Sequence, residues 1–349
     1  MKLFVKSLLV VALLLAAADA GAQTAAISAS IPPSGRANGM GEAFVAVVDD
    51  ASAAWWNPGA LGLLKKRDLS LSHAQLVPGL ASDVYHDFMA YAQPIRHVGT
   101  LAFSLVYLSY GQTTGTGNVG EDLGTFNAYE ILPAISYGFA LPGGVGLGAT
   151  FKYTRVQLAP DDILVQLGLP PGSGAGSTWA ADLGFMWAPP VLGKRVSLGA
   201  ALQNLGPDIS FIDHNRSDPI YRNFKGGVGV KVYDHQGLTA LVVGDINQLL
   251  VRGEIEARDD SGNVTVRRRY GKPIWNGGAE VAYTITNVAV ALRGGYIQDT
   301  DGSISDPTFG MGLGYKGFRI DFASIPQASD PETGTKLDRV KKFTLGARF

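Results

Sequence analysis

From Asp68 to the end of the chain, bulky apolar residues alternate with small or polar ones in short runs. In the run Gly146–Thr154, one face carries Leu147, Ala149, Phe151 and Tyr153. A period of two residues predicts strands that are apolar on one side only. About fourteen such runs occur, with lengths close to or above the roughly 9–11 residues of a tilted membrane strand. The predicted strands are Leu69–Val77, Val84–Ile95, Thr100–Leu108, Phe126–Leu141, Gly146–Thr154, Trp179–Trp187, Arg195–Leu205, Phe224–Tyr233, Leu238–Gln248, Ile274–Ile285, Val288–Gln298, Thr308–Tyr315, Phe318–Ile325 and Val340–Phe349.

The connections between these strands alternate between short and long. Tight connections such as Leu141–Val145 and Tyr315–Gly317 are interleaved with the long segments Gly111–Thr125, Ala159–Ser177, Gly206–Arg222, Leu249–Pro273 and Pro326–Arg339. Outer-membrane barrels have short periplasmic turns and longer extracellular loops. The pattern therefore predicts an all-β fold, a transmembrane antiparallel barrel of about fourteen strands.

The first residues, Met1–Ala22, have the features of a secretory signal peptide. Lys2 and Lys6 precede the apolar run Ser7–Ala18, and an A-x-A cleavage site ends at Ala20 or Ala22. The run is too short for a spanning helix, which needs about 20 apolar residues, and no later run reaches that length. We expect export with cleavage of the signal, which leaves a soluble secreted protein or a barrel as the mature form.

The last strand places Phe343, Leu345, Ala347 and Phe349 on one face. We interpret Phe343, Leu345 and Phe349 as a signal read by the barrel-assembly machinery, the alternative being an ordinary amphipathic terminal strand. With the export signal and the alternating strands, this end predicts a location in the outer membrane, where lipid surrounds the chain.

Composition excludes several functions. Only 17% of the 349 residues are charged, below the roughly 25% usual for soluble domains, and the net charge of -1 gives no field that attracts nucleic acid. The chain has no cysteine, and its five histidines are not spaced as metal ligands. It also has no G-x-S-x-G hydrolase motif. We predict no enzyme activity, no cofactor and no metal, with one alternative: Asp299–Asp306 is either a hairpin turn or a calcium loop.

If the bulky face meets lipid, the opposite face lines the lumen and carries charges of both signs. The main ones are Lys152, Asp182, Glu280, Arg293, Arg319 and Asp321. Neighbouring strands supply Lys152 with Asp182 and Glu280 with Arg293, so we expect structural ion pairs. A strongly ion-selective pore would show one dominant sign.

Pro133 falls well inside the strand Phe126–Leu141. A closed barrel has no edge to accept a proline, so we expect a bulge or kink there. The alternatives are a strand that starts later, or a lateral window through which an apolar ligand reaches the bilayer. The charged stretch Arg252–Tyr270 also has alternative interpretations: a solvated loop, an extended outer hairpin or a partner-docking surface.

The segment Ser34–Gly62 follows a short linker and differs from the strands after it. It is rich in small residues, contains the pair Asp49-Asp50, and ends in Trp55-Trp56-Asn57-Pro58-Gly59. Asp50 and Ser52 can cap a short helix from about Ala51 to Trp56, and Pro58-Gly59 forces a turn. The segment is too small for a domain of its own, so we expect it to fold inside the barrel as a plug. The predicted division is 1–22 signal, 23–66 linker and plug, and 67–349 barrel.

The order of residues in this segment resembles the N-terminal hatch of FadL-like outer-membrane barrels, and within them the PorV/PorQ family of type IX secretion. The resemblance rests on Arg36, Gly39, Gly41, Asp49, Asp50, Trp55, Asn57 and Pro58, and on the stretches Ala181–Gly184 and Gln203–Gly206. Asn57-Pro58-Gly59 departs from the more usual Asn-Pro-Ala. The resemblance implies a non-enzymatic secretion component whose partners are the translocon and cargo signal domains. The alternative is a FadL-like transporter of fatty acids or other hydrophobic molecules.

Overall fold

The computed structural model describes residues 25–117, 121–190, 193, 195–211, 217–258, 264–328 and 338–349, and of residues 252–258 and 264–269 the backbone only. The predicted signal peptide therefore lies outside the described residues. The helices are η1 (Ile27–Ala29), α2 (Gly35–Gly39), α3 (Ala53–Trp56), α4 (Pro58–Leu61) and α5 (Asp161–Gln166). None of the helices in these ranges is long and apolar enough to cross a membrane.

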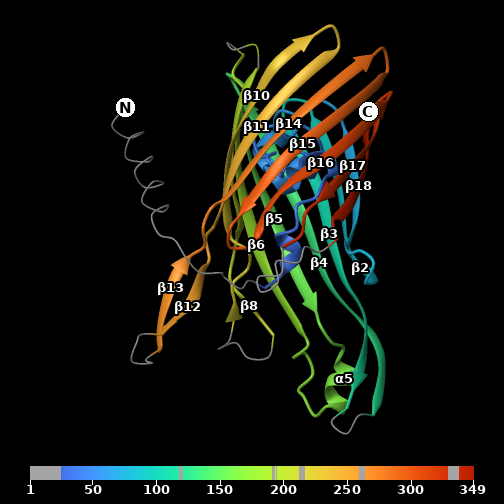
Figure 1. The fold of residues 1–349 in the computed structure, drawn as a ribbon, viewed down its shortest axis with the longest axis vertical. Coiled ribbons are helices and arrows are strands. Elements are labelled where there is room, and N and C mark those ends of the chain that lie inside the picture. Colours follow the sequence, from blue (N-terminus) through green and yellow to red (C-terminus); the bar gives the residue numbers. More distant parts are fainter. Residues whose placement is uncertain are drawn as a thin grey trace.

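Fourteen strands of the described chain close into an antiparallel barrel, which confirms the predicted fold (Figure 1). They are β1 (Asp68–Val77), β2 (Ala81–Ile95), β3 (Gly99–Thr116), β4 (Asp122–Leu141), β5 (Val145–Gln157), β6 (Ala175–Trp187), β7 (Val196–Leu205), β10 (Asn223–His235), β11 (Leu238–Leu249), β14 (Ile274–Ile285), β15 (Val288–Asp299), β16 (Ile304–Tyr315), β17 (Phe318–Ile325) and β18 (Val340–Arg348). The ring closes where β1 pairs with β18, with Asp68 opposite Arg348.

Two small hairpins stand outside this ring. One pairs β8 (Ile209–Ser210) with β9 (Ser217–Asp218), and the other pairs β12 (Arg252–Arg258) with β13 (Val264–Tyr270). Barrel pairing passes directly from β7 to β10 and from β11 to β14. The stretch Arg252–Tyr270 is therefore a separate hairpin and does not lengthen the barrel strands.

The long connections are shorter than the sequence predicted. The segment Gly111–Thr125, expected as a loop, is mostly strand, because β3 and β4 stay paired as far as Thr116 and Asp122. Two irregularities in register, at Ser109/Gln112 and Gly115/Thr116, let this ladder continue. The segment Ala159–Ser177 contains α5 and the first residues of β6. In Figure 1, α5, β8 and the β12–β13 hairpin all lie toward the end of the barrel that carries the long connections.

The alternation of side chains places bulky residues outside and small or charged residues inside. On β6, Trp179 and Leu183 face outward, each 52% exposed, while Ala180 and Asp182 between them are buried. The outward residues meet lipid and the inward ones meet the plug, as expected for a membrane strand.

The described residues from Ile27 to Leu64 lie within the ring and contact the inner wall on several sides. Their main apolar core joins Met40, Phe44, Trp55, Trp56 and Leu61 to wall residues such as Phe88, Val106 and Leu132. The predicted helix Ala51–Trp56 begins only at Ala53, and Ser52 makes no side-chain cap. The Ser52 hydroxyl and backbone N–H instead both donate to Asp50 Oδ1.

Plug and wall approach each other through backbone where wall strands carry glycine. A Cβ added to Gly148 of β5 would lie 2.1 Å from the carbonyl oxygen of Pro58, and one on Gly184 of β6 would lie 2.5 Å from the Gly59 nitrogen. The Pro58-Gly59 turn therefore fits against the wall only because these positions have no side chain.

We expect Gly148→Ala to lower the free energy of unfolding by about 1–3 kcal/mol, because the added methyl group overpacks the plug interface. Urea unfolding of the lipid-reconstituted barrel measures the change. The matched control is Gly294→Ala on β15, where an added Cβ has nothing within 4 Å. Equal stability of the two variants would contradict the close contact.

Candidate functional site

The plug runs from the long-loop end of the lumen to the short-turn end. At its start, the Ala25 N–H donates to the carbonyl of Pro219, 3.0 Å away. At its finish it reaches β1, whose first residue Asp68 stands beside the C-terminal end of β18. The segment therefore passes through the whole barrel, and the side chains that fix it on the way are the candidate functional site.

Glu130 of β4 holds the first turn of the plug. Its carboxylate accepts the N–H of Ile27 at 3.2 Å and of Ser28 at 2.9 Å, and also the hydroxyls of Ser28 and Tyr110. The carboxylate is buried and its partners are neutral donors, so it acts as an anchor for the backbone. Glu130 was not selected from the sequence. The alternation along β4, in which Tyr129 faces outward and Glu130 inward, could have identified it as a charge inside the barrel.

Arg36 joins the plug to β14. Its Nε and Nη2 donate to the two oxygens of Glu280 at 2.8 and 2.9 Å, and its Nη1 donates to Asp49 at 2.7 Å. Burial alone would lower the pKa of Arg36, but the charges of Glu280 and Asp49 outweigh it and raise the pKa well above its usual value. The guanidinium stays charged and holds two plug turns against one wall strand.

The same wall carries the predicted pair Glu280 with Arg293 and extends it to Asp321. Arg293 Nε donates to Glu280 at 2.6 Å, and its Nη1 donates to Asp321 of β17 at 2.7 Å. The structure thus joins four of the predicted residues, Arg36, Glu280, Arg293 and Asp321, into one chain of ion pairs.

Asp50 belongs to a second cluster at the short-turn end. Arg319 forms an ion pair with Asp50 at 3.1 Å and a bidentate pair with Asp68, both nitrogens 2.9 Å from its oxygens. Arg348 Nε donates to the same Asp68 at 2.9 Å. Asp68 is fully buried at the plug–barrel junction. It was not selected from the sequence because it lies just before the first predicted strand, Leu69–Val77.

The second predicted pair, Lys152 with Asp182, lies on the other side of the lumen. Lys152 Nζ is 2.7 Å from Asp182, whose second oxygen accepts the N–H of Asn204 at 2.7 Å. Asn204 has a left-handed backbone (φ 58°) at an irregularity in the β6–β7 register. Its neighbour Gln203 donates to the carbonyl of Trp55 in the plug. The two resembling stretches thus meet as one bulge that also contacts the plug.

The Trp55–Pro58 turn is held by its asparagine. Asn57 Nδ2 donates to the carbonyls of Val45 and Phe185, at 2.8 and 2.9 Å, and its Oδ1 accepts the Gly59 N–H at 3.0 Å. Asn57 therefore caps α4, and Pro58 at the first helical position needs no donor. The ammonium of Lys225, another residue missed in the sequence, lies 5.0 Å from the Trp55 ring.

The glycines at 39 and 41 lie where the plug crosses β14–β16. A Cβ on Gly39 would be 2.9 Å from the Cα of Gly310, and one on Gly41, which has φ 66°, would be 2.6 Å from the carbonyl oxygen of Gly277. The Gly41 N–H donates to Thr308 at 2.8 Å. Backbone contact with the wall and a left-handed conformation both favour glycine at these positions.

Pro133 lies in the middle of β4 and does not shift the register. Its pairing with Leu105 of β3 is retained, while the β4–β5 ladder omits Leu132 and Pro133 and resumes in the same register at Ala134. Of the expected bulge or kink, the bulge is therefore wrong, and the kink stays a prediction. The alternative that the strand starts later is also wrong, since β4 begins at Asp122. A proline here removes one donor from the ladder without adding a residue. The lateral window stays a prediction.

The remaining predicted sites are peripheral. Phe343, Leu345 and Phe349 face outward. Recognition of these residues by the barrel-assembly machinery stays a prediction. In the acidic turn, Asp299 accepts the N–H of Gly302 and Asp301 accepts that of Lys272. In the described ranges, no group of three acidic, histidine or cysteine side chains is arranged to hold a metal ion.

Two cavities border the plug. One of about 380 Å³ lies beside Arg36, Asp49 and Arg348 at the short-turn end. The other, about 360 Å³, lies at the long-loop end between η1 and the apolar side chains of Val156, Leu158 and Phe211. The arginines of the first cavity are all bonded to carboxylates, so the site fastens the plug and presents no activated nucleophile.

Comparisons with known proteins agree with this architecture. Residues 16–255 match the family described as type IX secretion system protein PorV. No curated protein sequence matches the chain. Among solved structures, the chain is similar to the toluene transporter TodX of Pseudomonas putida, with a TM-score of 0.53, 14% identity, and 89% of this chain and 95% of that chain covered.

Two further solved structures are similar to the same extent. The toluene transporter TbuX of Ralstonia pickettii gives a TM-score of 0.51 at 14% identity, covering 90% of this chain and 97% of that one. A FadL homologue of Pseudomonas aeruginosa gives a TM-score of 0.50 at 14% identity, covering 89% of this chain and 97% of that one. At this identity the likeness shows the FadL-like barrel fold alone.

We expect Arg319→Gln to lower the free energy of unfolding by about 3–5 kcal/mol, because it leaves buried Asp68 and Asp50 without this partner. Arg348 still contacts Asp68, which favours the lower end of that range. Urea unfolding measures the stability, and limited proteolysis of the plug reports its release. Lys231→Gln is the control, since its pair with Asp234 is exposed and contributes about 1 kcal/mol or less. A similar loss in both variants would rule out the special role of Arg319.

Proposed function

We propose, on the premise that this chain belongs to the PorV family of type IX secretion system proteins, that it receives exported cargo or associates with the secretion translocon at the outer membrane. The observation that carries the proposal is the family match over residues 16–255, which includes the plug. The role is non-enzymatic: the protein binds other proteins, and the barrel-assembly machinery inserts it into the membrane.

The filled lumen supports a binding role over a wide water channel. The plug contacts β4, β5, β6 and β14–β18 through backbone and ion pairs, so a folded cargo has no free path through the barrel. A protein partner therefore binds at an end or on the outer face. The long-loop end is the larger candidate surface, because α5 and both small hairpins lie there (Figure 1).

Apolar side chains on the β5–β6 connection strengthen this choice. Leu158, Val165 and Leu169 are 45%, 56% and 45% exposed. They lie in or beside α5, beyond the barrel. Exposed apolar groups rimmed by polar residues are typical of protein-binding surfaces.

We expect Val165→Asp with Leu169→Asp to reduce secretion of cargo by at least about tenfold, because two charges desolvated at an interface oppose binding. Complementation of a deletion strain, with cargo measured in medium and periplasm, tests this. Val98→Asp, a substitution of the same kind at a 54% exposed residue of the β2–β3 turn, lies at the opposite, short-turn end and is the control. If the deletion strain itself secretes cargo at the normal level, the proposed function is wrong.

The second candidate is transport of hydrophobic small molecules, and the similar structures TodX and TbuX are toluene transporters. The cavity of about 360 Å³ between η1 and Val156, which is lined by apolar side chains together with Tyr110, Glu130 and Asp218, favours it. Val156→Trp fills this cavity, so we expect loss of binding of a fluorescent fatty acid with secretion unchanged. The opposite result, intact binding with lost secretion, separates the two functions.

A further inference from the structure

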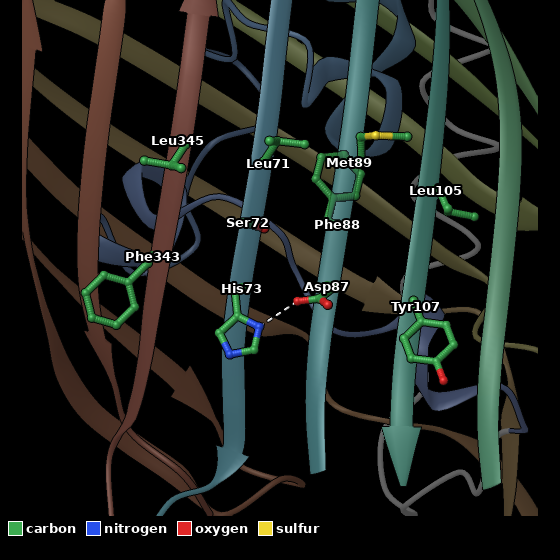
Figure 2. Close-up of a pocket in the computed structure, with 10 residues that line it drawn as sticks. All are labelled: Leu71, Ser72, His73, Asp87, Phe88, Met89, Leu105, Tyr107, Phe343 and Leu345. Carbon is green, nitrogen blue, oxygen red and sulfur yellow. Dashed lines mark hydrogen bonds and ion pairs between the residues drawn. The ribbon is translucent and has the colours of Figure 1, made fainter. Parts of the chain in front are cut away.

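A groove crosses the outer face of the barrel over β18, β1, β2 and β3. It has a volume of about 360 Å³, and Figure 2 shows its apolar part, lined by Leu71, Met89, Leu105, Phe343 and Leu345. These residues alternate with inward ones along their strands, so they belong to the surface that meets lipid. The groove is therefore open to the hydrocarbon region of the membrane.

One end of the groove is polar. His73 Nδ1 lies 2.6 Å from Asp87 Oδ1, and both side chains point outward, 57% and 45% exposed (Figure 2). The rings of His73, Tyr85, Tyr107 and Tyr129 follow one another across four strands, with centroids 5.6, 6.0 and 5.9 Å apart. Rows of tyrosine mark the boundary between hydrocarbon and headgroups. The polar end therefore lies at headgroup depth.

This boundary faces the outside of the cell. The short turns, the start of β1 and the end of β18 share one end of the barrel, and short turns face the periplasm. From Phe349 toward Val340, β18 passes from apolar outward residues to Lys341. The groove thus extends from hydrocarbon depth to the headgroups of the outer leaflet.

One cation, Lys341, stands at the polar end without a carboxylate partner. Lys341 faces outward on β18, opposite Gln75, and is one diagonal position from His73, about 7–8 Å between backbones. In the described part of the chain, Lys341 makes no ion pair. Arg339 does not belong to the groove, because it contacts β16 and β17, where it donates to the carbonyls of Pro307 and Ser324. The carboxylate of Asp87 is hydrogen-bonded to His73 and does not pair with Lys341.

We propose that this groove binds a phosphorylated glycolipid of the outer leaflet, with one acyl chain along Leu71 and Met89 and a phosphate against Lys341 and His73. The combination of an apolar channel and the unpaired cation Lys341 at headgroup depth fits an anionic lipid. A neutral lipid leaves Lys341 unpaired, and inorganic phosphate leaves the apolar channel unfilled. The proposal rests on the barrel and its orientation, and not on the secretion role.

The test is native mass spectrometry of the full chain in non-ionic detergent, titrated with bis-phosphorylated lipid A and with the same lipid after removal of its phosphates. We expect the phosphorylated form to bind one molecule tightly. Lys341→Gln should weaken this binding about fivefold, as expected for one lysine near an anionic headgroup. Lys316→Gln, at the short turn on the opposite side of the membrane, is the charge-matched control and should change it by less than about twofold.

A second variant tests the channel and keeps the charges. Met89→Trp fills the groove and should abolish tight binding, whereas Met311→Trp, an outward methionine on β16, should not. Equal effects of Lys341→Gln and Lys316→Gln, equal binding of the phosphate-free lipid, or displacement by inorganic phosphate would each overturn the proposal. A dimer mass that Met89→Trp removes would assign the groove to a second copy of the chain and would also overturn it.

Discussion

Backbone hydrogen bonding in a medium without water is the constraint on which this structure depends. In hydrocarbon, every strand must pair on both sides, so a sheet survives only when its first and last strands join. Here the joint is the pairing of β1 with β18, which aligns Asp68–Gln75 with Lys341–Arg348. Once fourteen strands close, the interior is too wide for wall side chains to fill, and the plug occupies it.

Charge then determines how the plug sits. Apolar contact between small residues and a glycine-rich wall has little directional preference, whereas Arg36 reaches both Glu280 and Asp49 in one orientation only. Arg319 does the same for Asp50 and Asp68. Buried ion pairs give modest net stability but penalise every arrangement that breaks them. We infer that these pairs select the position of the plug, while its tryptophans and Met40 supply the apolar burial.

Much of the fold could be predicted from the sequence, because an alternating pattern maps directly onto a sheet with one lipid face. All fourteen strands and the pairs of Lys152 with Asp182 and Glu280 with Arg293 follow from that pattern. The extra length of β3 and β4 did not, since their outer ends are polar on both faces in water. Asp68 was missed because it precedes the first residue of the predicted strand, although its partner Arg319 was selected. Glu130 and Lys225 were missed because their partners are backbone and ring groups of the plug, which no spacing rule connects to them. A bulge was expected at Pro133, but a proline only removes one N–H donor from the ladder and inserts no extra residue, so the register is unchanged.

The position of Asp68 has a consequence for how the molecule is made. It is the first residue of the first strand, and its carboxylate is bonded to Arg319 and Arg348 of the last two strands. The plug precedes it in the chain and is already tied to the middle of the sheet through Glu280 and Glu130. The same carboxylate therefore ties the junction between plug and barrel to the two strands that complete the ring. We infer that the sheet wraps around its N-terminal segment, so that assembly of the wall and packing of its contents are one step.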